Sequence, residues 1–284
     1  MTLSLLLSAG LSLAFGGLPQ DRADGEADPV RQEKERIRSK APLTDAQKAA
    51  YALLAPPPAR PRASYTLAVV PLEFSDRKLG DPDVAAKVVA GLADYYAKAS
   101  SGRFKLDGKV RGRVLLDGDR ERFERKDLEK ALAGLPACDG IAFVAAGGLV
   151  PRNAPLWPHR GVVKSGEREL DYLLVPEDAP GAVAAHEFMH LLGFADKYDD
   201  EKASVADACI LGTGYSVRKP PPPCAECRLR LGWASAAVVE PGAAASLTLT
   251  ADLTRALQIK LTPDGEETLL LELRERLLIW HTGG

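Results

Sequence analysis

The stretch HEFMHLLGFAD, residues 186–196, decides how the rest of the chain is interpreted. Residues four apart lie on the same face of a helix, so His186 and His190 can bind one metal ion together. Glu187 then stands beside that ion, where a carboxylate can act as a general base. The spacing therefore predicts a zinc-binding helix.

The end of the same stretch supplies a third candidate ligand. Gly193 can end the helix in a left-handed turn, and this turn brings Asp196 back towards the histidines. Three protein ligands leave a fourth coordination position for water, as in a catalytic zinc site. The competing interpretation is a buried apolar helix with two core histidines, which is less favoured because histidine is only intermediate in burial.

Length and composition bound the class of protein. A chain of 284 residues with 46% hydrophobic residues can form one large or two modest domains around a normal core. The 37 basic and 39 acidic residues give a net charge of −2, so no overall attraction to nucleic acid or to an anionic membrane is expected. We expect a monomer that acts on a protein or peptide substrate.

The N-terminal region has the composition of an export signal followed by a linker. Residues 3–15 form an apolar run of signal-peptide length, too short for a membrane span, which predicts a signal peptide over 1–19 and a secreted or extracytoplasmic protein without stable membrane insertion. A buried or disordered N-terminus is the alternative. Residues 20–63 are charged and then Pro-rich, as in a propeptide or a linker.

Four cysteines, an even number, favour disulfides in an exported protein. Three pairings are open among Cys138, Cys209, Cys224 and Cys227. The last two could instead form a second metal site or a redox motif. Neither is favoured, because no second CxxC or nearby His pair completes a four-ligand site and the preceding proline run is no strand-to-helix context. We expect a disulfide-stapled loop after the zinc helix.

The apolar patterns predict an α+β fold. Helices are expected at 82–99, 122–135 and 181–192, and strands at 65–74, 104–116, 140–146 and 170–175. The helix over 181–192 is apolar nearly all round, so it should be buried beneath a mixed β-sheet. Further short β-rich runs are expected at 246–250, 257–261, 268–273 and 277–280. The prediction is a catalytic domain over 64–235 followed by a β-rich C-terminal segment over 236–284.

Together these residues resemble the immune inhibitor A family of secreted zinc metallopeptidases. The family pattern HExxHxxGxxD is matched in full by residues 186–196. Shorter stretches that are similar to other landmarks of the family lie at 95–106, 156–160, 230–233, 272–274 and 277–281. The resemblance covers about residues 64–284, and it implies a zincin-like fold and zinc-dependent endopeptidase activity.

The resemblance and the residues lead to the same mechanism. His186, His190 and Asp196 would hold zinc, which lowers the pKa of its water to about 7. Glu187 would take the proton from that water as it attacks the scissile carbonyl and pass it to the leaving amine. Tyr215 and His159 are candidates for an oxyanion donor, but packing or surface roles are favoured for both. Zinc hydrolysis of a non-peptide substrate stays open as well.

Two features leave further alternatives open. The turn over 209–214 lacks the methionine that related zinc peptidases place under the metal, which raises the alternative of a weak or inactive zinc-binding protein that acts by binding a partner. Asp199, Asp200 and Glu201 could bind calcium through their carboxylates. A solvated acidic loop is the favoured interpretation of these three residues, because their spacing matches no defined calcium loop.

Overall fold

The computed structural model describes residues 2–7, 58–151, 154–165, 168–197, 206–212, 219–243 and 245–282. Contacts divide the chain into two compact units, one comprising Glu33–Pro223 and the other Met1–Gln32 with Cys224–Gly284. The division between residues 223 and 224 lies earlier in the chain than the domain boundary predicted after residue 235. Among the described residues, no helix is long and apolar enough to cross a membrane.

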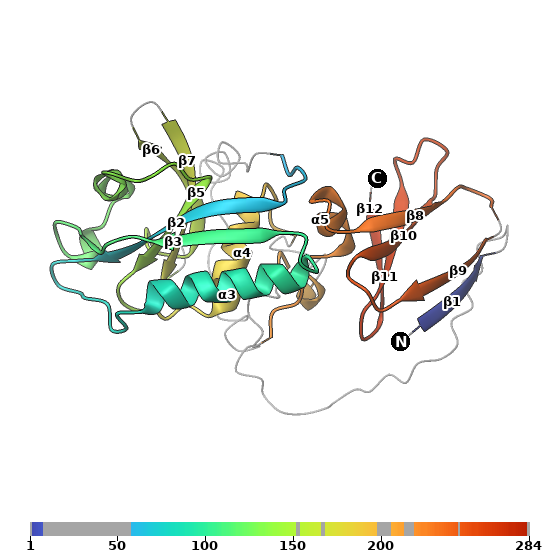
Figure 1. Cartoon of the computed structure of the whole chain (residues 1–284), viewed down its shortest axis with the longest axis horizontal. Helices are drawn as coiled ribbons and strands as arrows, with labels where there is room; N and C mark the ends of the chain where they lie inside the picture. Colours follow the sequence, from blue (N-terminus) through green and yellow to red (C-terminus); the bar gives the residue numbers. More distant parts are fainter. Residues whose placement is uncertain are drawn as a thin grey trace. The chain divides into compact units, whose positions relative to one another are not determined.

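The Glu33–Pro223 unit is built on one mixed sheet with the strand order β3-β2-β5-β7-β6 (Figure 1). Strand β2 pairs in parallel with β3, β4 and β5; β5 pairs in parallel with β7; and β6 is an antiparallel edge. The strands are β2 (Ser64–Glu73), β3 (Lys105–Val110), β4 (Val114–Leu115), β5 (Gly140–Ala145), β6 (His159–Ser165) and β7 (Arg168–Pro176).

Most of these strands follow the sequence pattern, and two differences have a physical cause. Every residue of β5 is buried, which explains why its sequence is apolar throughout and does not alternate. The single strand predicted over 104–116 is wrong, because residues 111–113 separate β3 from β4. Strand β6 was not predicted, because apolar and polar residues alternate poorly in its sequence HRGVVKS. Its Gly161 lies against the ring of Tyr172, where an added Cβ would come within 2.5 Å of ring atoms.

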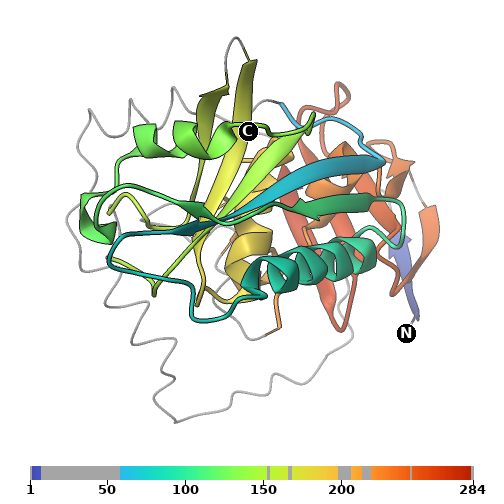
Figure 2. The ribbon, with the colours of Figure 1, turned by 60° about the vertical axis from the view of Figure 1, so that its left-hand side comes forward.

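Two α-helices lie on the same side of this sheet, as Figures 1 and 2 show from two directions. They are α3 (Val84–Ala99), which packs on β2 and β3, and α4 (Gly181–Leu191), which packs on β6 and β7. Both predicted helices are thus confirmed. Phe188 of α4 packs between aromatic rings, at centroid distances of 5.1 Å from Tyr65, 4.9 Å from Tyr96 and 6.3 Å from Phe104.

The aromatic cluster around Phe188 should dominate the stability of this layer. Phe188 is fully buried, so Phe188→Ala removes its ring contacts and leaves a cavity. We expect the free energy of unfolding to fall by about 3–5 kcal/mol, measured by urea denaturation. A loss below about 1 kcal/mol would show that the layer collapses around the smaller side chain.

Two 3-10 helices follow β4, and the second of them contributes apolar residues to the opposite face of the sheet. They are η1 (Arg120–Arg122) and η2 (Arg125–Leu132), where an amphipathic α-helix was expected over 122–135. That expectation is wrong because Phe123 has an extended backbone, and Glu124 then starts a new turn with a capping box to Asp127. The cluster includes Leu128 and Leu132 of η2 together with sheet residues such as Phe143 and Leu174.

The other unit contains a four-stranded sheet with the order β12-β11-β10-β8. Strands β10 and β8 are parallel, and the other pairs are antiparallel. The strands are β8 (Ser235–Val239), β10 (Arg255–Lys260), β11 (Thr268–Leu273) and β12 (Leu277–Thr282). A separate antiparallel pair joins β1 (Thr2–Leu7) to β9 (Ala245–Thr250). Strand β1 falls within residues 1–19, the predicted signal peptide. A pairing of strands does not test export, so the signal peptide stays a prediction.

The short helix α5 (Ala225–Arg230) is held to β11 by one buried carboxylate. Glu272 of β11 is 1% exposed and accepts a hydrogen bond from the backbone N–H of Ala225 at 3.1 Å. It also pairs with the guanidinium of Arg228, which is 0% exposed. Arg274 (3.0 and 2.9 Å) and the indole N–H of Trp280 (2.8 Å) complete its contacts.

Removing this carboxylate should be costly. Glu272→Ala leaves the buried charge of Arg228 without its main counter-charge, which typically destabilises a protein by about 3–5 kcal/mol. We expect a loss of that size in chemical denaturation, against little change for the exposed Glu266→Ala. Equal stabilities of the two variants would contradict a structural role for the pair.

Candidate metal centre

Helix α4 presents the two histidines and Glu187 from a rigid, buried position. Its first turn starts after Pro180, and its remaining side chains are mostly small or apolar and buried. The hydroxyl of Tyr96 donates to the carbonyl of Ala185 at 2.6 Å, which ties the middle of the helix to α3. His186 is 4% exposed and Glu187 is 7% exposed. The side chains of His186 and Glu187 are therefore held in place by the residues that pack around α4.

The turn after α4 forms as the sequence predicted. Gly193 has a φ of +96°, a left-handed conformation that other residues adopt only with strain. Its N–H donates to the carbonyl of His190 at 3.1 Å, and the N–H of Phe194 donates to the carbonyl of Met189 at 3.2 Å. These bonds end the helix and reverse the chain, so Asp196 returns to the histidine face.

Three candidate ligand atoms converge at this place. The Nε2 atoms of His186 and His190 are 3.2 Å apart. One carboxylate oxygen of Asp196 lies 3.0 Å from Nε2 of His186 and 3.5 Å from Nε2 of His190. A tetrahedral zinc ion with bonds of about 2.0–2.1 Å has its ligands about 3.3 Å apart. The triangle of the three atoms therefore fits a zinc ion with three protein ligands.

Both imidazole rings are oriented by backbone carbonyls. Nδ1 of His186 donates to the carbonyl of Ile210 at 2.8 Å, and Nδ1 of His190 donates to the carbonyl of Phe194 at 2.7 Å. A ring that donates through Nδ1 keeps the lone pair of Nε2 available for a metal. The sequence did not reveal these two contributions, because any residue type can supply a carbonyl.

Glu187 stands next to the three ligand atoms and completes a negative environment. Its carboxylate oxygen is 3.9 Å from Nε2 of His190, and it belongs to one close group of candidate metal-binding atoms with the two histidines. Burial by itself lowers the pKa of His186, but the hydrogen bond that its ring donates to Asp196 and the charges of Glu187 and Asp196 outweigh burial and raise that pKa to about 8. The site thus stabilises a positive charge at its centre.

Comparisons with known proteins give a distant likeness among solved structures. No protein-family model matches the chain, and no curated protein matches it. Among solved structures, the chain is similar to the crystal structure of metalloproteinase-II from Bacteroides fragilis, with 14% sequence identity and a TM-score of 0.40. The match covers 69% of this chain and 59% of that one. The immune inhibitor A family is not confirmed and stays a prediction.

His159, a candidate oxyanion donor in the sequence, is engaged in other contacts. Nδ1 of His159 is 2.6 Å from the carbonyl of Trp157 and its Nε2 is 3.0 Å from the hydroxyl of Tyr172, so the ring is used to fix β6 on β7. His281 is exposed and lies 2.9 Å from a carboxylate oxygen of Glu267. Tyr215 and the acidic group Asp199, Asp200 and Glu201 lie outside the described residues.

The predicted disulfide is not formed among the four cysteines, all of which belong to the described residues. All four cysteines are in the thiol form, and Cys224 and Cys227 lie at the start of α5. Cys224 has an extended backbone and immediately precedes the helix, whereas the sequence favoured no helix here. The disulfide itself stays a prediction.

Proposed function

We propose that the chain is a secreted zinc-dependent endopeptidase with a zincin-like catalytic domain followed by a β-rich C-terminal segment. The observation that supports it is the triangle of two imidazole Nε2 atoms and one carboxylate oxygen, with the buried carboxylate of Glu187 beside it. Structural zinc sites use four protein ligands, whereas three ligands with an adjacent general base are typical of hydrolases.

The ligand residues and Glu187 have separate tasks. His186, His190 and Asp196 would hold the ion, and the carbonyls of Ile210 and Phe194 keep both rings aimed at it. A zinc ion bound there supplies a Lewis acid for the scissile carbonyl and lowers the pKa of a bound water towards about 7.

Glu187 moves the proton in this proposal. Its carboxylate accepts a proton from the attacking water and delivers it to the nitrogen of the leaving group. An amine leaves only once it is protonated, so a carboxylate that can take up and return one proton suits amide cleavage. Because Glu187 is 7% exposed, bulk water screens its charge little.

Metal removal tests the proposal directly. Purified chain should contain about one zinc ion, and it should cleave members of a mixed peptide library. Dialysis against a chelator should abolish cleavage, and added zinc should restore it, because the ion supplies the Lewis acid. Mass spectrometry of the peptides and elemental analysis of the protein provide the two readouts.

The outcomes separate the alternatives. Cleavage that persists after the metal has been removed would refute zinc catalysis. Stable zinc binding with no cleavage of any peptide would instead favour the alternative of a zinc-binding protein that acts by binding a partner.

A further inference from the structure

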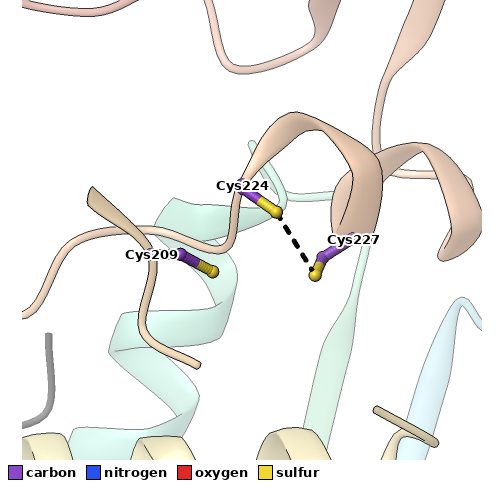
Figure 3. Close-up of side chains that lie close together, drawn as sticks. All are labelled: Cys209, Cys224 and Cys227. Atoms are coloured by element: carbon purple, nitrogen blue, oxygen red, sulfur yellow. Dashed lines mark hydrogen bonds between the residues drawn. The ribbon is translucent and has the colours of Figure 1, made fainter. Parts of the chain in front are cut away.

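A pair of cysteines at the start of α5 lies outside the candidate metal centre and is not used by the proposed function. Figure 3 shows the side chains of Cys224 and Cys227 turned towards one another. The thiol of Cys224 donates to the sulfur of Cys227, with 3.6 Å between the two sulfur atoms. A disulfide bond is about 2.05 Å long, so the sulfur atoms need to approach by only about 1.6 Å.

The backbone gives the two side chains this common direction. Cys224 precedes the helix with φ −63° and ψ 167°, and Cys227 lies in its first turn. The carbonyl of Cys224 accepts from the N–H of Arg228 at 3.1 Å, so the chain between the two cysteines is already closed into a turn. Closing the sulfur bond therefore requires side-chain rotation and little change of the backbone.

The same turn is anchored at both ends by Glu272. This carboxylate binds the N–H of Ala225, directly after the first cysteine, and the guanidinium of Arg228, directly after the second. Burial lowers the pKa of Arg228, while Glu272 and the two cysteine sulfurs act in the opposite direction. The turn that carries both cysteines is therefore held in place by one buried ion pair.

We propose that Cys224 and Cys227 are an oxidation site at which an intramolecular disulfide closes across the first turn of α5. The oxidant is a low-molecular-weight disulfide of the glutathione type. One cysteine thiolate attacks a sulfur of the oxidant and expels one thiolate, which gives a mixed disulfide. The second cysteine loses its proton, attacks the protein sulfur of that mixed disulfide and expels the other half of the oxidant.

The atoms and electrons of this exchange balance. Two protein thiols and one oxidant disulfide give one protein disulfide and two small thiols, and two electrons pass from the protein to the oxidant. Both cysteines are buried, at 2% and 0% exposure, so the turn must open locally before the oxidant reaches them, and we expect both the formation and the reduction of the bond to be slow.

The test counts thiols in the full chain. Protein reduced beforehand is incubated in a buffer of oxidised and reduced glutathione until the count is constant, then denatured, alkylated and mapped by mass spectrometry. We expect two of the four thiols to disappear and the peptides that contain Cys224 and Cys227 to be joined. The double variant Cys138→Ser with Cys209→Ser should lose the same two thiols.

The thiol test overturns the proposal in two ways. One is a map that joins either cysteine to Cys138 or Cys209, and the second is a count that stays at four thiols. A separate metal measurement gives a third contradicting result. This result is a zinc ion that is retained by His190→Ala and released when thiols are alkylated, since this would make the pair a metal ligand. Cys227→Ser serves as the matched variant and should keep its three remaining thiols throughout. None of these results bears on peptide cleavage, so this proposal and the proposed function can fail independently.

Discussion

Replacing Glu187 with Gln is expected to lower peptide cleavage by about 10²–10⁴-fold while zinc stays bound. The amide has nearly the shape of the carboxylate, but it cannot accept the proton of the attacking water. The three ligand atoms belong to other residues, so the ion should be held as before. Initial rates on a peptide substrate and zinc content per chain give the two values.

A matched control is available in the same unit. Glu129 is an exposed residue of η2, and Glu129→Gln makes the same chemical change away from the centre. It should leave both rate and zinc content unchanged. If Glu187→Gln cleaved peptides at the rate of Glu129→Gln, Glu187 would not be the base.

Replacing His190 with Ala is expected to lower zinc affinity by more than 10²-fold. Outer residues that only orient a ligand typically contribute 10–100-fold, so removal of the ligand itself should cost more. The two atoms left, on His186 and Asp196, give the ion two protein ligands instead of the three of a catalytic zinc site. Competition with a zinc-binding dye measures the affinity.

His281→Ala is the corresponding control, because His281 is exposed, pairs with Glu267 and belongs to the other compact unit. Its zinc affinity should equal that of the unchanged protein. Circular dichroism of both variants verifies that each one is folded. Full zinc affinity in a folded His190→Ala would rule out this centre as the metal site.

The sequence predicted the geometry of the centre to the extent that it follows from spacing. His186 and His190 share a helix face because they are four residues apart, and Gly193 adopts the left-handed turn that its position required. The carbonyl of Ile210 was not predictable, because it reaches His186 from a segment 24 residues later in the chain. Long-range contacts of the backbone leave no pattern in a single sequence.

The strands and helices show the same limit on what a single sequence can predict. Continuous apolar runs identified β5 and β7, since strands buried on both faces need apolar residues at every position. The edge strand β6 needs fewer of them and was missed. Helix α5 was missed as well, because six residues carry too little periodicity and the helix depends on a carboxylate from β11 that is distant in sequence.

The turn at Gly193 has a consequence for how the centre responds to its metal. His190 belongs to a buried helix, whereas the side chain of Asp196 beyond the turn is 40% exposed. A metal ion that binds both residues closes a very short loop, so little chain entropy is lost on closure. A metal ion bound by both residues would therefore join the segment after the turn to the C-terminal end of α4, and Asp196 would be the candidate ligand most open to solvent.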